Sequence, residues 1–298
     1  MTEISRGGLV QNRIELGIFY YSVGVFAMSV LDACAKWLST NYSVPQIALL
    51  ESSVGLTLVL LINKDNAFAL LRTEHLGLQI TRGLFTLGVI YFFFFGVRYF
   101  RLADIVAVVA SAPLIMLVLA SLLLKERINL TSKLAVLVGF FGAMLIIKPG
   151  WTVVQWAAIL PACCALCYAS AAIVSRKLAP FDNPWTTLAY SQTIIFIISA
   201  PLTLFYWLDM TPADIFIIIV MGIAGTTSVY LRIKSFRYAP VNVVAPFDYT
   251  GIGWATIFGF VIWAEFPDLI VWLGIIAIAL SGIYLLKQTS KKAPRPSK

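Results

Sequence analysis

Ten apolar segments, each about as long as a membrane-spanning helix, dominate this sequence of 298 residues. A helix needs roughly 20 apolar residues, within a range of about 17–25, to cross the hydrocarbon core of a bilayer. The segments cover residues 15–38, 45–63, 76–97, 103–124, 130–147, 152–175, 185–207, 213–235, 241–263 and 267–286. Because the connections between them are short, neighbouring helices must run antiparallel. We expect an all-α integral membrane protein with ten transmembrane helices.

The composition excludes a water-soluble protein. Apolar residues make up 60% of the chain and charged residues only 12%, whereas soluble domains carry about 25% charged residues. The net charge of +8 does not indicate a nucleic-acid partner, because the basic residues lie between the apolar segments and in the C-terminal tail. We expect the lipid bilayer to be the main surrounding of this chain.

The distribution of basic residues predicts the orientation in the membrane. With a cytoplasmic N-terminus, the inside connections hold twelve Lys and Arg residues, Arg232 among them, and the tail holds five more. The outside connections hold only Arg98, Arg101, Lys148 and, at a helix edge, Lys36. Cytoplasmic segments are enriched in Lys and Arg. We therefore expect both termini to be cytoplasmic, in a multi-pass protein of the cell inner membrane.

The sequence lacks the groups that an enzyme or a metal site needs. Its four cysteines lie inside apolar segments, and its one histidine, His75, lies in a polar connection. Cys164 and Cys167 have the CxxC spacing, but no second ligand pair accompanies them, so we expect buried apolar thiols and no metal. No Walker A, GxSxG or HExxH sequence is present. We predict no enzymatic activity, no catalytic residues, no cofactor and no direct use of ATP.

The two halves of the chain match each other. At an offset of 139 residues, Arg98-Tyr99 falls on Arg237-Tyr238, Glu126 on Glu265, Ala135 on Gly274 and Lys148 on Lys287. We expect a first repeat at 1–149, a second at 150–287, and a disordered basic cytoplasmic tail at 288–298. Each repeat has five crossings, an odd number, so the two must be inverted. Inverted repeats suit alternating access, although channels also contain them.

Ionisable residues inside the apolar segments are the first candidates for function, because each costs about 2.5–3.5 kcal/mol to insert. Asp32 and Lys36 share one helix face, so they either neutralise each other or meet a zwitterionic substrate. Glu51 is expected either to carry a proton or to pair with Lys36 or Arg82. Arg82 is itself a candidate for substrate binding.

A second group of candidates lies in segment 241–263. Pro246 loosens the helix just before Asp248 and Tyr249, and Trp254 lies at mid-membrane depth. A carboxylate beside aromatic rings suits a cationic or planar solute. The alternative is that Asp248 pairs with an arginine such as Arg82 and braces two helices. Asp248 is also a coupling candidate.

The remaining candidates are polar groups on other helices. Ser111 matches Thr250 in the repeat, so the two hydroxyls are expected to face each other. Tyr168, Thr227 and Tyr230 complete the expected substrate site, with hydrogen bonds between helices as an equal alternative. Glu126 and Glu265 are interpreted as structural. The small residues Ala135, Gly139 and Ala143 favour close helix packing or, as a minor alternative, a homodimer contact.

Several stretches together resemble the EamA branch of the drug/metabolite transporter superfamily. They are Thr81-Arg82-Gly83-Leu84, Leu102-Ala103-Asp104, Ser111-Ala112-Pro113-Leu114, Leu122-Leu123-Leu124-Lys125-Glu126-Arg127, Ala245-Pro246-Phe247-Asp248-Tyr249-Thr250, Gly253-Trp254-Ala255 and Trp263-Ala264-Glu265. The resemblance covers nearly the whole chain. It implies two five-helix repeats around a cavity lined by the first, third, fourth, sixth, eighth and ninth helices, with the fifth and tenth at the periphery.

Within that branch the chain is most similar to riboflavin-transporter-like and S-adenosylmethionine-transporter-like proteins. It departs from them in the second segment, where they tend to carry Phe-Phe-Arg-Ser and this chain has Leu49-Leu50-Glu51-Ser52. The resemblance implies secondary transport of a small organic metabolite, resembling an amino acid, a nucleoside or a vitamin. A channel or a signalling protein is the alternative. Substrate, direction, coupling ion and oligomeric state stay open.

Overall fold

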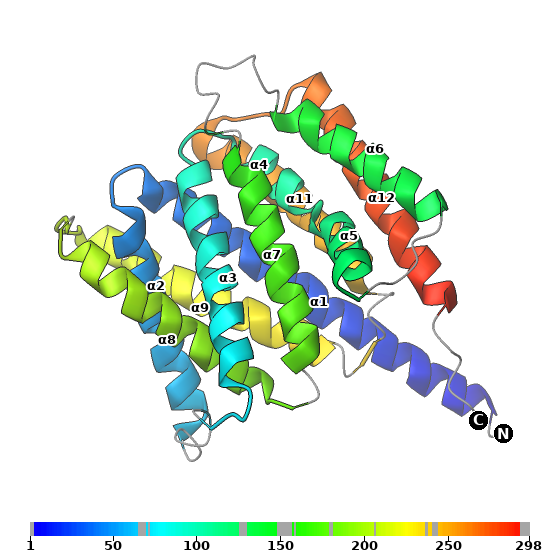
Figure 1. Ribbon diagram of the computed structural model, residues 1–298, viewed down its shortest axis with the longest axis horizontal. Helices are drawn as coiled ribbons and strands as arrows, with labels where there is room; N and C mark the ends of the chain where they lie inside the picture. The colour runs from blue at the N-terminus through cyan, green and yellow to red at the C-terminus, as the bar shows by residue number, and fades with distance from the viewer. Residues whose placement is uncertain are drawn as a thin grey trace.

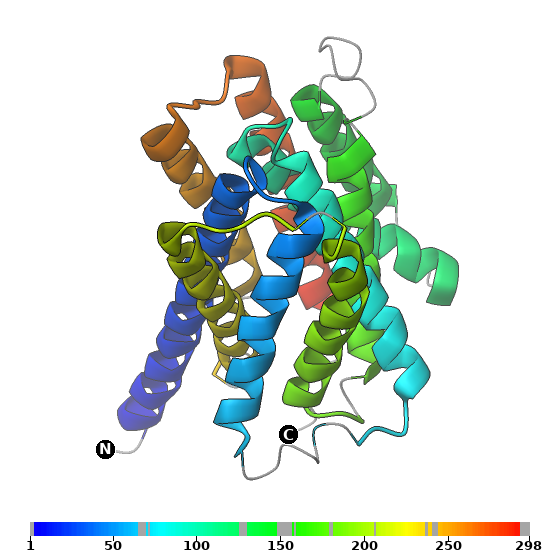
Figure 2. The same cartoon turned by 90° about the vertical axis from the view of Figure 1, so that its left-hand side faces the viewer.

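The computed structural model of the chain is an all-helical bundle (Figures 1 and 2). It describes residues 3–64, 70, 72–124, 130–147, 157, 159–178, 181–205, 207–235, 238–239 and 244–292. The first half contains α1 (Glu3–Ser39), α2 (Val44–Ile62), α3 (Leu76–Gly96), α4 (Leu102–Val109), α5 (Ala112–Leu124) and α6 (Leu130–Ile147). The second half contains α7 (Ile159–Leu178), α8 (Pro184–Thr203), α9 (Pro212–Ser235), the 3-10 helix η4 (Ala245–Tyr249), α11 (Thr250–Trp263) and α12 (Leu269–Lys292).

The helices pack as two equivalent units. Exchanging the halves turns the contact of α1 with α9 into that of α7 with α3, and the contact of α2 with α9 into that of α8 with α3. The pairs α2–α8 and α6–α12 each join a helix to its own counterpart, and α4–α11 joins the fourth predicted helix of one half to that of the other. In Figure 1, α6 and α12 lie side by side at one edge of the bundle. This pairing matches the two repeats predicted from the offset of 139 residues.

Two of the predicted helices are interrupted at equivalent positions. Segment 103–124 divides into α4 and α5, and the segment that ends at residue 263 divides into η4 and α11. The Ser111 hydroxyl donates to the Val108 carbonyl at 2.6 Å, and the Thr250 hydroxyl donates to the Phe247 carbonyl, also at 2.6 Å. The two donors, Ser111 and Thr250, are 139 positions apart in sequence, and the two acceptors, Val108 and Phe247, are also 139 positions apart. A side-chain hydroxyl that bonds a nearby carbonyl replaces part of the backbone ladder at a break.

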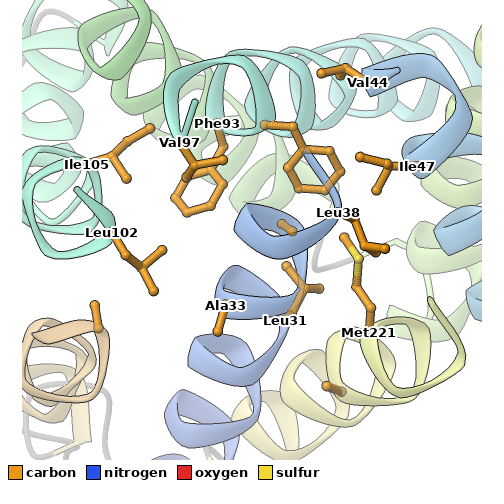
Figure 3. Packing of buried hydrophobic residues seen from close by; sticks show 14 of the residues in the cluster. Leu31, Ala33, Leu38, Val44, Ile47, Phe93, Val97, Leu102, Ile105 and Met221 are labelled. Atoms are coloured by element: carbon orange, nitrogen blue, oxygen red, sulfur yellow. The ribbon is translucent and has the colours of Figure 1, made fainter. Parts of the chain in front are cut away.

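The largest core cluster lies towards the end of the bundle where α1 stops at Ser39, which we call the Ser39 end. The opposite end, where α1 begins, is called the Glu3 end. Figure 3 shows Leu31 and Leu38 of α1 packed near Met221 of α9, with Phe93 of α3 and Leu102 of α4 close by. These side chains come from both repeats, so this cluster joins the two units.

Helix lengths agree with a membrane protein, although helix ends differ from those predicted. Among the described residues, the stretches Ile14–Ser39, Val44–Ile62, Leu76–Gly96 and Pro212–Arg232 are long and apolar enough to cross a bilayer. Shorter apolar helical stretches occupy Leu102–Met116, Leu134–Ile146, Ile159–Ser175 and Leu269–Tyr284. The first helix begins before residue 15, at Glu3, and the last runs past 286 to Lys292, so 288–292 of the predicted tail are helical.

Candidate functional site

A cluster of charged and phenolic groups joins α1, α7, α9 and η4 towards the Glu3 end. Arg232 of α9 donates from Nη2 to Asp248 Oδ1 at 2.5 Å, and the Tyr21 hydroxyl donates to Asp248 Oδ2 at 2.6 Å. The same Nη2 lies 3.2 Å from the Tyr21 hydroxyl and 3.5 Å from the Tyr168 hydroxyl. Both oxygens of the Asp248 carboxylate are therefore bonded. We call these four residues the Arg232 cluster.

Close helix packing brings Arg232 into this cluster. A Cβ atom at Gly24 of α1 would lie only 2.9 Å from Arg232 Cγ, so the arginine passes directly over the glycine. The guanidinium then lies 5.2 Å from the centre of the Tyr21 ring, within range of a cation–π contact. The α1–α9 contact thus needs a residue without a side chain at position 24.

A second ion pair joins α1 to the chain just after α11, at the Ser39 end of the bundle. Lys36 of α1 pairs with Glu265, which follows α11, and the ammonium lies 4.9 Å from the centre of the Trp263 ring. Asp104 of α4 also acts electrostatically on Lys36. The expected neutralisation of Lys36 by Asp32 is therefore replaced by a pair 229 positions apart in sequence.

A helix end with left-handed backbone places Glu265. Ala264 has φ 54°, and the amides of Ala264 and Glu265 donate to the carbonyls of Phe260 and Gly259 at 2.9 Å and 3.0 Å. Glycine usually occupies such a left-handed position at a helix end, whereas here it is an alanine. The turn directs the chain back over the end of α11, and Glu265 then reaches Lys36.

A third polar group also lies at the Ser39 end. Tyr42 and Thr211 donate to the Asp214 carboxylate at 2.7 Å each, and Trp37 donates to it at 3.2 Å. This hydrogen bond from its phenol to the carboxylate raises the pKa of Tyr42, which lies in the connection between α1 and α2. Arg98 donates to the Tyr42 carbonyl at 2.6 Å. These contacts tie the first connection to the start of α9.

Between the two ion pairs, α1 and α11 present aromatic and acidic groups. Trp254 of α11 meets Phe26 of α1 edge to face, with ring centres 4.9 Å apart, and Phe258 lies one turn further along α11. Asp32 is buried two turns beyond Phe26 on α1. The predicted residues Asp32, Asp248 and Trp254 therefore lie along one pair of packed helices.

Arg82 lies elsewhere and has neutral partners. Its Nε donates to Ser175 of α7 at 2.8 Å, and its Nη1 donates to the Thr187 carbonyl at 3.2 Å and to the Ser191 hydroxyl of α8. Arg82 thus braces α3, α7 and α8, and the arginine beside Asp248 is Arg232.

Glu51 is buried where α2 meets α8 and α9. Its Oε1 accepts a 3.5 Å hydrogen bond from Gln192 of α8, and it lies 3.3 Å from the position that a Cβ atom would take at Gly225. The predicted partners Lys36 and Arg82 are bound elsewhere, to Glu265 and to the α7–α8 hydroxyls.

The remaining predicted residues have local contacts. Ser111 bonds its own helix, Tyr230 stacks on Trp185 with ring centres 5.3 Å apart, and Thr227 is half-buried on α9. The Tyr249 hydroxyl points towards α12, where a Cβ atom at Gly282 would lie 1.5 Å from it. A substrate role for these four stays a prediction, as it does for the other candidates.

Sequence reasoning missed Tyr21, Arg232 and Gln192 as partners of the predicted carboxylates. Arg232 was counted as a loop charge because it lies near the C-terminal end of an apolar segment. The sequence feature that points to Arg232 is Asp248 itself, since a carboxylate inside a membrane helix needs a cation or a proton. Glu265 was interpreted as structural, and the structure adds that its partner is Lys36.

The periphery agrees with the expected place of the fifth and tenth helices. A shallow apolar groove runs between α6 and α12, lined by Leu134, Ala135, Val138, Leu280, Ser281 and Tyr284. The backbones of these helices approach closely, and a Cβ atom at Gly142 would lie 2.8 Å from the Gly274 carbonyl oxygen. Large apolar side chains on both helices, such as Phe141 and Leu280, are exposed.

Comparison with known proteins agrees with this architecture. Residues 15–148 and 155–287 each match the EamA-like transporter family. A solved crystal structure superposes on the chain with a TM-score of 0.66 at 15% identity, covering 92% of this chain and 99% of that one, and so shows the same fold.

Three relatives match along almost their whole length. A riboflavin transporter of Brucella anthropi is 26% identical over 89% of this chain and 96% of its own. An S-adenosylmethionine uptake transporter of Rickettsia bellii is 23% identical over 93% of this chain and 95% of its own. A pseudopaline exporter of Pseudomonas aeruginosa is 23% identical over 93% of this chain and 98% of its own.

Proposed function

Because the chain belongs to the EamA-like transporter family, a family of multi-pass membrane proteins, we propose that it is a secondary transporter of a small organic metabolite. The proposal places ten transmembrane helices in the bacterial inner membrane, as two inverted repeats with both termini cytoplasmic. The observation that carries it is the packing of the two repeats, in which the contacts of α1 with α9 and of α2 with α9 recur when the halves are exchanged. Two equivalent units can exchange conformations and so open either side of the membrane in turn.

The proposed substrate path runs along α1 on one side and along η4 and α11 on the other. It is held by the Arg232 cluster near the Glu3 end and by the Lys36–Glu265 pair at the Ser39 end. Asp32 and the Phe26–Trp254 contact lie between these two sites. A carboxylate beside aromatic rings favours a cationic or zwitterionic solute with a planar group.

The names of the relatives set the first compounds to test. Riboflavin has a planar ring system, and S-adenosylmethionine combines a cationic centre with an amino-acid group and a planar base. We propose one of these compounds, or a related amino acid or nucleoside, as the substrate.

A thermal-shift screen of the purified protein against these compounds, with dianionic metabolites as the contrasting set, identifies candidates. Each hit is then tested for counterflow in proteoliposomes. Saturable uptake that accelerates when the unlabelled compound is loaded inside supports the transporter. Ionic conductance without counterflow supports a channel instead, and a screen with dianionic hits alone contradicts the proposed site.

A further inference from the structure

Three buried oxygen atoms at the α2–α8–α9 interface have no hydrogen-bond partner. They are Glu51 Oε2, Gln192 Oε1 and Thr226 Oγ1, on side chains that are 4%, 6% and 4% exposed. Thr226 follows Gly222 by one helical turn and precedes Val229 by three residues. Gly222 packs on α2, and Val229 packs against buried residues of α2 and α8, so Thr226 faces the same interface.

If Glu51 is ionised, this interface has fewer hydrogen-bond donors than its buried acceptor oxygens need. The Gln192 amide already donates to Glu51 Oε1, and its own oxygen needs a donor. An ionised carboxylate only accepts hydrogen bonds, so the Thr226 hydroxyl would be the one remaining donor for two acceptors. A proton on Glu51 Oε2 adds a second donor and lets all three oxygens join one network.

No cation on the helices around α2 compensates Glu51 in the part of the chain that the structure describes. On α9, Arg232 is bound to Asp248, Lys234 lies over the Tyr20 ring, and Asp214 accepts from Tyr42. Helix α8 carries no charged residue, and its titratable group is Tyr190.

The described cations of α1 and α3 also lie elsewhere. Lys36 is bound to Glu265, and Arg82 is bound to Ser175 and Ser191. Asp32, the other buried charge of α1, is a carboxylate, and Tyr91 of α3 is bonded to Ser199. An ionised carboxylate buried without a cation is strongly unfavourable, so such a group binds a proton instead.

Tight packing at this interface favours a proton over a hydrated metal ion. A Cβ atom at Gly55 would lie 2.4 Å from Gln192 Nε2, and one at Gly225 would lie 2.7 Å from Leu31 Cδ1. Side chains thus fill the space on both sides of Glu51. A hydrated cation would need several water molecules here, whereas a proton needs no added volume.

We propose that Glu51 binds the coupling proton of the transport cycle, at a site formed with Gln192 and Thr226. Protonation forms an O–H bond at Oε2 with a proton from water on one side of the membrane, and release returns that proton to water on the other side. Asp248 does not take this role, because Arg232 and Tyr21 stabilise its charge. The inference rests on the proposed transport function for its place in the cycle, but the proton site itself can be tested alone.

Infrared spectroscopy of the purified full-length protein, titrated with acid and base, tests the proton site. We expect a carboxylic-acid C=O band at neutral pH that disappears at high pH. The band should be absent from Glu51→Gln and present in Asp248→Asn and in Ser52→Ala. Ser52 is a matched control, because it is buried beside Glu51 and its hydroxyl bonds the Leu49 carbonyl of its own helix. An unchanged band in Glu51→Gln overturns the proposal, as does a band that sodium chloride removes and choline chloride does not.

Proteoliposomes then test coupling with the substrate identified by counterflow. Glu51→Gln should retain counterflow but lose uptake driven by a pH gradient at least about tenfold, which is 1.4 kcal/mol of coupling free energy. Glu51→Asp should restore part of the gradient-driven uptake, and Ser52→Ala should transport like the wild type. Gradient-driven uptake that persists in Glu51→Gln overturns the coupling role. A wild type without counterflow instead contradicts the proposed function and leaves the infrared result standing.

Discussion

The two ion pairs along the α1–α11 side differ in chemistry and in burial. The Lys36 and Glu265 side chains are 6% and 27% exposed, and a tryptophan ring covers the ammonium. The Arg232 and Asp248 side chains are 21% and 41% exposed, and two tyrosine hydroxyls lie beside the guanidinium. One pair is a largely buried ammonium beside a tryptophan ring, and the other is a more exposed guanidinium within a network of phenols.

This difference sets what separation of each pair requires. When Arg232 and Asp248 part, water and the tyrosine hydroxyls can replace the lost hydrogen bonds. When Lys36 and Glu265 part, the ammonium is left against Trp263 with little access to water. We therefore expect the Glu3 end of the bundle to open at a lower free-energy cost than the Ser39 end. The three predictions below test this difference.

The largest effect is expected for Glu265→Gln. This change removes the carboxylate that is bonded to the buried Lys36 ammonium and leaves Asp104 to act on it from a distance, and breaking a buried ion pair typically costs about 3–5 kcal/mol. Chemical denaturation in detergent measures the loss in the free energy of unfolding. The charge-swapped variant Lys36→Glu with Glu265→Lys should recover part of this loss. A loss below about 1 kcal/mol for Glu265→Gln would show that the Ser39 end is not held by this pair.

A smaller loss of stability is expected for Arg232→Met. The carboxylate left behind is more exposed and keeps its bond from Tyr21, so we expect about 1–3 kcal/mol, as for a hydrogen bond to a charged group. The counterflow rate should fall further than the loss of folded protein alone would explain, because Arg232 belongs to the proposed substrate path. Asp248→Asn, which keeps the shape of the side chain, is the matched variant. Equal losses for Arg232→Met and Glu265→Gln would remove the distinction between the two ends.

The smallest effect is expected for Tyr21→Phe. This change removes one hydroxyl at 2.6 Å from Asp248 and keeps the aromatic ring under Arg232, so about 1 kcal/mol is expected. Thermal unfolding compared with wild type measures it. Tyr42→Phe at the Ser39 end is the control for loss of a tyrosine hydroxyl bonded to a carboxylate. A Tyr21→Phe loss as large as that of Arg232→Met would mean that the phenol, rather than the guanidinium, holds the cluster together.

The sequence was sufficient for the all-helical fold and its match to the EamA-like family, because both depend on patterns along the chain. The offset that matched Arg98 to Arg237 also matches Ser111 to Thr250, and these two hydroxyls make the same bond in the structure. The loosening beside Pro246 was predicted in the second repeat, whereas the break at Ser111 in the first repeat was not.

The partners of the charged residues could not be predicted, because they depend on how helices distant in sequence align. Lys36 could have met Asp32 one turn away, yet α1 and α11 run parallel and bring Glu265 to it. Arg232 lies at the end of an apolar segment, where a basic residue usually faces the membrane surface. Its inward position depends on the missing side chain of Gly24, which affects packing between helices and leaves no periodic signal.

The paired interruptions at Ser111 and Thr250 have a mechanical consequence. A continuous helix resists bending because each bend stretches several backbone hydrogen bonds, whereas here the ladder is already broken and a short 3-10 turn stands in for it on one side. Each repeat thus carries a flexible joint at the same point along its fourth helix. One joint is built on serine and the other on threonine after a 3-10 helix, so the two repeats differ in backbone geometry at this shared point.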